Sequence, residues 1–150
     1  MRAVIQRVSK ASVTIDQKVK SAIGQGLLIL LGVEKNDTYE DVLWLCKKIP
    51  SMRIFSDEEG KMNRSIQEVK GAMLVISQFT LHASTKKGNR PSYIQAARPE
   101  KAIPLYEHLV QGLAQESGLV VMTGEFGADM KVELLNDGPV TIIIDSKNKE

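Results

Sequence analysis

The sequence predicts one mixed α/β domain, covering residues 1–150, with far more strand than helix. A chain of 150 residues that is 43% apolar is long enough for a single hydrophobic core and short for two domains. Most apolar segments alternate with polar residues or form short unbroken runs, and both patterns are typical of β-strands. Only two segments repeat their apolar residues at the spacing of a helix. The α/β fold class follows from these three observations.

The first 33 residues are predicted to form strands. Residues 3–15 alternate loosely between apolar and polar side chains, which fits one bent strand or two short ones. Residues 18–23 are a further candidate strand. Residues 26–33 are apolar throughout, as expected of a central strand that is covered on both faces.

Two segments have the apolar period of a helix. The first begins after Thr38, a candidate N-cap, and runs to Ile49, with Pro50 expected just beyond its end. The second runs from about Pro99 to Ser117, where Gly118 can end the helix in the left-handed conformation.

The remaining segments alternate between strands and turns. We expect a short strand at 52–55, an acidic turn at 56–60, a buried strand at 72–80, and C-terminal strands at 119–123, 130–136 and 140–145. The residues Asn136-Asp-Gly-Pro139 lie between the last two strands. Their turn composition predicts that these two strands form a hairpin.

The supply of reactive side chains is small, with one cysteine, Cys46, and two histidines, His82 and His108. One cysteine excludes an internal disulfide, and three such side chains are a poor supply of zinc ligands, so we expect neither a metal nor another cofactor. Cys46 falls on the apolar stripe of the first helix. We interpret it as a small core residue rather than a nucleophile.

No apolar run in the sequence is long enough to cross a membrane. The longest, residues 27–31, is far short of the roughly 18 residues that a spanning helix needs. The N-terminal residues also lack the apolar region of a signal peptide. We therefore expect a cytoplasmic protein that does not contact membranes.

The net charge of +2 conceals an uneven distribution. Residues 1–20 and residues 84–101 each carry +4, from five basic residues and one acidic residue, whereas residues 102–150 carry −5, from three basic and eight acidic residues. The segment 84–101 has the glycine, asparagine and proline of a loop, together with a tyrosine. Such a loop suits RNA or a phosphate group, and a solvated surface loop explains the charge equally well.

The segment Ser77-Gln-Phe-Thr-Leu81 is the first of three that could carry chemistry. A buried strand gives way there to polar residues, and active sites often lie at such strand ends. Ser77 and Thr80 are candidate nucleophiles, and His82 would share a face with Thr80 if the strand continues. The simpler interpretation is that the hydroxyl groups cap the strand and that His82 is a surface residue.

The other two segments are Gly138-Pro139 and Glu125–Met130. An ordinary trans turn is the simplest interpretation of the first, yet a glycine carbonyl can approach a ligand closely because no side chain obstructs it. In the second, Phe126 and Met130 flank a Gly-Ala pair. They would either pack in the core or form the wall of a small pocket.

Taken together, SQFTL at 77–81, EFGADM at 125–130 and NDGPVT at 136–141 resemble the motifs of the D-aminoacyl-tRNA deacylases. The resemblance extends to MRAVIQRVSKASV at the start of the chain and to RPEKAIPLYEHLV in the second helix. It implies a homodimer of compact, barrel-like α/β subunits with a mostly antiparallel sheet. It also implies hydrolysis of the ester that joins a D-amino acid, or glycine, to the 3′-terminal adenosine of tRNA.

The same resemblance assigns roles to individual residues. Gly138-Pro139 corresponds to a Gly-cisPro motif that one subunit inserts into the pocket of the other, and Arg7 would hold that loop. The backbone N–H groups of Phe79 and Thr80 would stabilise the oxyanion. The residues expected to contact the substrate are Ser77, Gln78, Phe79, Ala102, Phe126 and Met130.

The resemblance also implies how the D form is selected. The carbonyls of Gly138 and Pro139 would fix the amino group of the substrate, so that a D side chain points to open space while an L side chain meets the carbonyls. A trans bond would turn these carbonyls away, as in related deacylases that act on L-alanine attached to the wrong tRNA. The motif NDGPVT favours the cis group.

The chemical step has two versions. Thr80 is either a nucleophile, or it contributes only its N–H group while the ribose 2′-hydroxyl of the substrate helps to activate water. We favour the second version because the chain has two histidines and no evident carboxylate partner for them. It also explains a preference for RNA over DNA, which lacks that hydroxyl.

Two other functions stay open. The first is a non-catalytic RNA-binding module that uses the basic loop at 86–101. The second is a structural oligomer in which the hairpin at 130–145 forms the interface.

Overall fold

Strand β1 (Arg2–Ile15) organises the sheet in the computed structural model, which describes residues 1–149. The first half of β1 pairs antiparallel with β3 (Gly26–Gly32), and its second half pairs antiparallel with β2 (Lys18–Ile23). The opposite edge of β1 pairs with β8 (Lys131–Asp145) over almost its whole length. Of the two alternatives for residues 3–15, the single bent strand is therefore confirmed.

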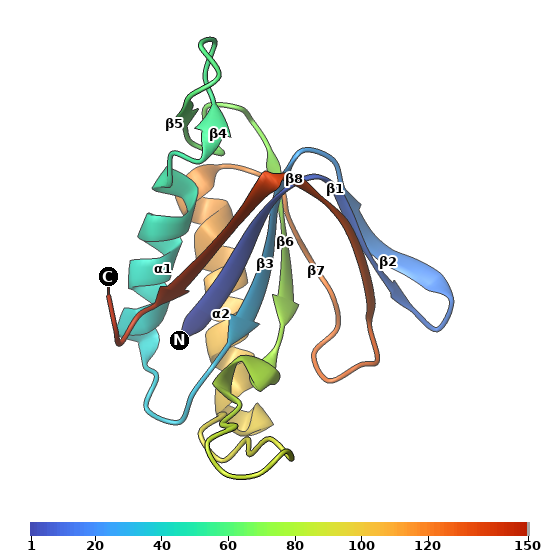
Figure 1. Ribbon diagram of the computed structural model, residues 1–150, viewed down its shortest axis with the longest axis vertical. Helices are drawn as coiled ribbons and strands as arrows, with labels where there is room; N and C mark the ends of the chain where they lie inside the picture. The colour runs from blue at the N-terminus through green and yellow to red at the C-terminus, as the bar shows by residue number, and fades with distance from the viewer. Residues whose placement is uncertain (150) are drawn as a thin grey trace.

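Two parallel strands extend the sheet beyond β3. Strand β6 (Ala72–Ser77) pairs with β3, and β7 (Val121–Thr123) pairs with β6. A small separate ribbon, β4 (Phe55–Ser56) with β5 (Met62–Arg64), lies at one end of the molecule (Figure 1). The predicted α/β fold with a mostly antiparallel, strand-rich sheet is confirmed.

Two helices cover one face of the sheet, α1 (Tyr39–Ser51) and α2 (Pro99–Ser117) (Figure 1). Thr38 is the N-cap of α1, and its backbone N–H donates to the Asp41 carboxylate at 2.8 Å. Helix α1 continues through Pro50, whereas the sequence predicted that Pro50 lies beyond its end. A proline this close to the C-terminus of a helix removes only one backbone hydrogen bond, and Pro50 packs in the interior. Helix α2 has its predicted bounds and ends at Gly118 with φ of +69°.

The bent sheet encloses two apolar cores. One lies between the helices and the sheet and contains Ile29, Leu31 and Val75. The other lies within the curve of the sheet and contains Leu28 and Leu74. Because neighbouring residues of β3 and β6 enter different cores, both strands are covered on both faces, as predicted for residues 26–33.

The predicted hairpin at 130–145 is wrong. Strand β8 runs in one direction throughout, and it pairs with β1 on both sides of Gly138-Pro139. Gln6 pairs with Thr141 and Val8 pairs with Asn136, so residues 137–140 bulge out opposite Arg7. The turn residues make a bulge rather than a reversal, because both halves of β8 find their partner in the same long strand.

Strand β6 is shorter than predicted. The backbone N–H of Gln78 still donates to the Leu31 carbonyl at 2.7 Å, but β3 ends at Gly32 and offers no further partner. The chain therefore enters a short 3₁₀ helix, η1 (Phe79–His82). Thr80 and His82 thus do not lie on a strand, and His82 is buried rather than on the surface.

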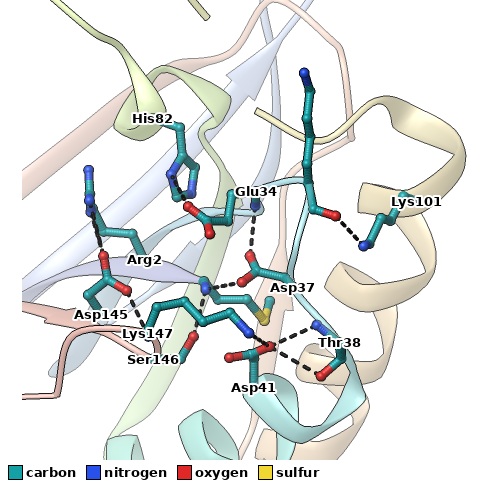
Figure 2. A network of polar contacts seen from close by, with 12 residues as sticks. Arg2, Glu34, Asp37, Thr38, Asp41, His82, Lys101, Asp145, Ser146 and Lys147 are labelled. Carbon is teal, nitrogen blue, oxygen red and sulfur yellow. Dashed lines mark hydrogen bonds and ion pairs between the residues drawn. The ribbon is translucent and has the colours of Figure 1, made fainter. Parts of the chain in front are cut away.

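A polar network joins the two ends of the described chain to the loop before α1 (Figure 2). The Met1 ammonium donates to the Asp37 carboxylate and to the Ser146 hydroxyl, and both partners of the ion pair are inaccessible to solvent. The Lys147 ammonium donates to the Asp41 carboxylate at 2.8 Å. Burial alone would raise the pKa of Asp41, but the hydrogen bonds that its carboxylate receives from Lys147, Ser146 and Thr38 hold the pKa well below its usual range.

Among residues 1–149, no helix has the length and the apolar composition that crossing a membrane requires.

We predict that Gly26→Ala destabilises the fold by about 3 kcal/mol, because the new Cβ would lie 1.8 Å from the Ala72 carbonyl oxygen in the β3–β6 ladder. Gly24→Ala is the matched control, because no atom lies within 4 Å of the added Cβ. Urea unfolding measures both variants, and the control should stay within about 0.5 kcal/mol of wild type. Equal stabilities for the two variants would contradict the close approach of these strands.

Candidate active site at the end of strand β6

The turn that follows β6 presents free backbone donors. Phe79 and Thr80 are the first two residues of η1, and the first N–H groups of a helix have no partner within it. The Leu81 N–H donates to the Gln78 carbonyl at 3.2 Å, which closes the turn. The side-chain amide of Gln78 donates to the Thr80 hydroxyl at 2.5 Å. This arrangement can hold an anionic oxygen without a charged side chain.

A cavity of about 260 Å³ adjoins this turn. Two chain segments form it, the end of β6 with the start of η1, and the loop that leads into β8. Its lining residues are Ile76, Ser77, Gln78, Phe79, Phe126, Gly127, Ala128, Asp129, Met130 and Val132. The structure thus brings together five residues that the resemblance implicates: Ser77, Gln78, Phe79, Phe126 and Met130.

The loop side of the cavity depends on close packing. The Phe126 ring packs edge-on against Tyr106 at 6.1 Å between centroids, and Tyr106 in turn donates to the Val75 carbonyl at 2.8 Å. A Cβ on Gly124 would meet the Met130 sulfur at 2.4 Å, so Gly124 makes room for Met130. Ile76 and Val132 also line the cavity, although the sequence did not predict them there. The alternation from Met130 to Val132 was the available signal, since residues two apart on a strand share a face.

Ala102 lies apart from this cavity. It is 5% exposed, and it packs in the core between the helices and the sheet. Its expected place beside a bound adenosine stays a prediction.

The residues that could activate a nucleophile are not arranged to do so. The described part of the chain contains no hydrogen bond between Thr80 and His82. The Nδ1 atom of His82 lies 3.6 Å from the Glu34 carboxylate. The Nε2 atom of His82 is buried and has no hydrogen-bond partner among the described residues. His108 lies on α2 and packs edge-on against Tyr39. Burial raises the pKa of the Cys46 thiol to about 11, so it is protonated at neutral pH.

A second candidate element is the bulge at residues 137–140. The Gly138–Pro139 bond in it is cis. Arg7 is 8% exposed, and its guanidinium donates to the carbonyls of Asp137 at 3.0 Å and Ile54 at 2.7 Å. The Asn136 side chain accepts from the Val140 N–H at 2.9 Å. The bulge is therefore held from both sides, while Gly138 and Pro139 are exposed.

The bulge and the cavity lie at opposite ends of the sheet (Figure 1). Arg7, which faces the bulge, pairs with Leu27, and Leu27 pairs with Met73 at the start of β6. The cavity begins near the other end of β6, at Ile76, about 10 Å further along the strand at the usual rise per residue. Within one chain, the structure does not bring Gly138 and Pro139 to the cavity.

Among residues 1–149, no group of three or more His, Cys, Asp or Glu side chains is placed to bind a metal ion.

Comparison with known proteins identifies relatives of the whole chain. The family model described as D-Tyr-tRNA(Tyr) deacylase matches residues 4–145. The D-aminoacyl-tRNA deacylases of Bacteroides fragilis and Bacteroides thetaiotaomicron are 69% and 65% identical over 150 residues, which is the full length of each pair.

Two solved structures share the fold. A protein titled c-Myc DNA Unwinding Element Binding Protein is 39% identical to this chain and has a TM-score of 0.92. The match covers 97% of this chain and 98% of that chain. A probable eukaryotic D-amino acid tRNA deacylase has a TM-score of 0.82 at 16% identity, with 95% of this chain and 97% of that chain covered. The second likeness concerns the fold alone.

Proposed function

The chain belongs to the D-Tyr-tRNA(Tyr) deacylase family, and from that premise we propose that it hydrolyses the ester bond between a D-amino acid, or glycine, and the terminal adenosine of tRNA. Curated deacylases that are 69% identical over the full length support this activity. The observation that carries it is the cavity beside η1, where the SQFTL segment meets the EFGADM segment.

The geometry of η1 supports a site built mainly from backbone. In the proposed reaction, water adds to the ester carbonyl, and the charge that develops on its oxygen is stabilised by the N–H groups of Phe79 and Thr80. One such donor contributes about 2.7–4 kcal/mol in other acyl-transfer enzymes. The bond to the ribose 3′-oxygen then breaks, that oxygen takes up a proton, and the free amino acid leaves.

The proton acceptor for the attacking water is proposed to come from the substrate. The Thr80 hydroxyl accepts from Gln78 and has no histidine or carboxylate partner among residues 1–149, so it is poorly placed as a nucleophile. The 2′-hydroxyl of the terminal ribose lies next to the ester by its covalent structure. It can therefore assist the water, and its absence from DNA restricts the reaction to RNA.

We further propose that two copies of the chain complete each site. Gly138 and Pro139 are exposed and lie at the far end of the sheet from the cavity of their own chain, so only a partner could bring their carbonyls to it. Those carbonyls would accept hydrogen bonds from the amino group of the substrate and occupy the space that an L side chain needs. Discrimination by backbone atoms should tolerate many different D side chains.

The activity is tested with D-Tyr-tRNA and L-Tyr-tRNA as substrates. We expect loss of the D ester and little loss of the L ester, because an L side chain would collide with the backbone filter. Release of the amino acid is followed over time. Equal rates for the two esters would contradict the filter, whereas salt-sensitive tRNA binding with both esters intact would favour the non-catalytic RNA-binding module.

The role of Thr80 is tested by exchanging its side chain and, separately, the hydroxyl of the substrate. We expect Thr80→Ala to retain most of kcat, because the substitution keeps the backbone N–H. A substrate that ends in 2′-deoxyadenosine should react at least about 100-fold more slowly, which is the loss seen when one catalytic hydrogen-bonding group is removed from other acyl-transfer sites. An inactive Thr80→Ala enzyme that folds normally, together with a reactive deoxy substrate, would identify Thr80 as the nucleophile instead.

The shared site is tested by mixing two damaged chains. Met130→Trp fills the cavity and leaves the bulge intact, whereas Gly138→Ala places a Cβ 2.8 Å from the Arg7 guanidinium and leaves the cavity intact. If sites are shared, co-expression should restore about a quarter of wild-type activity, since about half of the dimers are mixed and each has one complete site. Light scattering gives the oligomeric state. A monomer, or no recovery from two folded variants, would refute the arrangement.

A further inference from the structure

The segment that follows η1 forms a closed loop beside the proposed site. Ser84 and Ser92 exchange backbone hydrogen bonds of 2.8 and 2.9 Å, which ties together the ends of the loop that they enclose. Figure 1 shows this part of the chain beside η1, at the same end of the molecule as the loop between β7 and β8. We refer to residues 84–93 as the basic lobe.

The basic lobe carries positive charge that the fold does not use. Lys86, Lys87 and Arg90 are exposed, and residues 84–93 include no acidic side chain. Within the part of the chain that the structure describes, none of these three cations has an ion-pair partner. By contrast, Lys61 and Lys131 each lie within 3.0 Å of a carboxylate. The lobe is thus a concentrated positive surface that is free to bind an anion.

An aromatic pair connects the lobe to the cavity. The Tyr93 ring lies edge-on to the Phe79 ring, with 5.1 Å between centroids, and Phe79 lines the cavity. Both rings are partly open to solvent, with Phe79 54% exposed and Tyr93 40% exposed. The neighbouring Ile94 is 70% exposed. Exposed aromatic side chains therefore connect the cavity to the basic lobe.

Cations beside an exposed aromatic surface match the chemistry of single-stranded RNA. Its phosphates pair with lysine and arginine, and its unstacked bases can lie on aromatic rings, whereas bases in a duplex are already stacked. An acidic peptide would satisfy the cations but not the aromatic surface. The 3′ end of tRNA is unpaired, and any substrate with its terminal adenosine in the cavity extends away from the cavity mouth.

We propose that the basic lobe binds the unpaired nucleotides that precede the terminal adenosine of the substrate, with Lys86, Lys87 and Arg90 on their phosphates and Tyr93 beneath a base. This inference rests on the proposed function. The lobe then adds affinity for tRNA without touching the ester, so it acts on KM rather than on kcat.

The experiment compares two substrates, D-Tyr-tRNA and a D-tyrosyl ester of adenosine that has no phosphate. The variant is Lys86→Ser/Lys87→Ser/Arg90→Ser. We expect kcat/KM to fall about tenfold or more for the tRNA, through KM, and to stay within twofold for the adenosine ester. For the tRNA, the logarithmic dependence of kcat/KM on salt should become shallower by about 2, as expected for three lost phosphate contacts on a single strand.

The matched control removes the same charge elsewhere. Lys10, Lys18 and Lys20 are exposed on β1 and β2, and Lys10→Ser/Lys18→Ser/Lys20→Ser should leave both substrates nearly unchanged. An equal loss in this control would show that net charge alone is responsible and would overturn the inference. So would a lobe variant that hydrolyses both substrates as wild type does.

Tyr93 is tested separately. Tyr93→Ala should raise KM for tRNA about tenfold, in line with the loss of one stacked base, while Tyr93→Phe should match wild type because it keeps the ring. An equal loss on the adenosine ester would assign Tyr93 to the cavity and contradict the lobe. If wild-type protein hydrolyses neither substrate, it is the proposed function that fails, and that result differs from every outcome that overturns the lobe alone.

Discussion

The pairing of β1 with β8 is the constraint on which the rest of the structure depends. Strand β1 pairs with β2 and β3 along one edge and with β8 along the other, and its pairing with β8 continues in a shifted register on the far side of residues 137–140. Arg7 stands where that register is interrupted. Its buried guanidinium donates to the carbonyl of Asp137, which the bulge leaves without a partner in the ladder, and to the carbonyl of Ile54. The hydrogen bonds of Arg7 thereby fix the position of Gly138 and Pro139, which are exposed.

The candidate site owes its geometry to the interior of the sheet. Strand β6 is buried on both faces and lies between two parallel neighbours, so its last residue has little freedom. The cavity wall from the loop before β8 is packed against the same core through Phe126 and Tyr106. The basic lobe begins immediately after η1 and is closed by its own backbone bonds. The segments proposed to carry out the reaction are therefore held in place by the core, whereas the basic lobe, proposed to add affinity for tRNA, lies outside the core.

Local signals in the sequence predicted the elements that depend on local interactions. Helix α2 has a proline at its start and a glycine at its end, and β2 is bounded by turns, so both ranges were correct. The hairpin was wrong because turn-forming residues at 136–139 fit a bulge as well as a reversal, and the long-range pairing with β1 decides between the two. The end of β6 was misplaced because it depends on where β3 stops, more than forty residues earlier. The burial of His82 likewise depends on a tertiary contact, since its ring packs where Gly32 lacks a side chain.

The proposed oxyanion donors are backbone N–H groups, and this limits how the segment 77–82 can vary. Every residue except proline supplies an N–H group, so substitutions at Phe79 or Thr80 leave the donors in place while the side chains adapt to different substrates. Their direction, however, is set by the Gln78–Leu31 hydrogen bond and by the turn that starts one residue later. One inserted or deleted residue would change the direction of both N–H groups. The proposed site therefore constrains the number of residues in this segment more strictly than their identity.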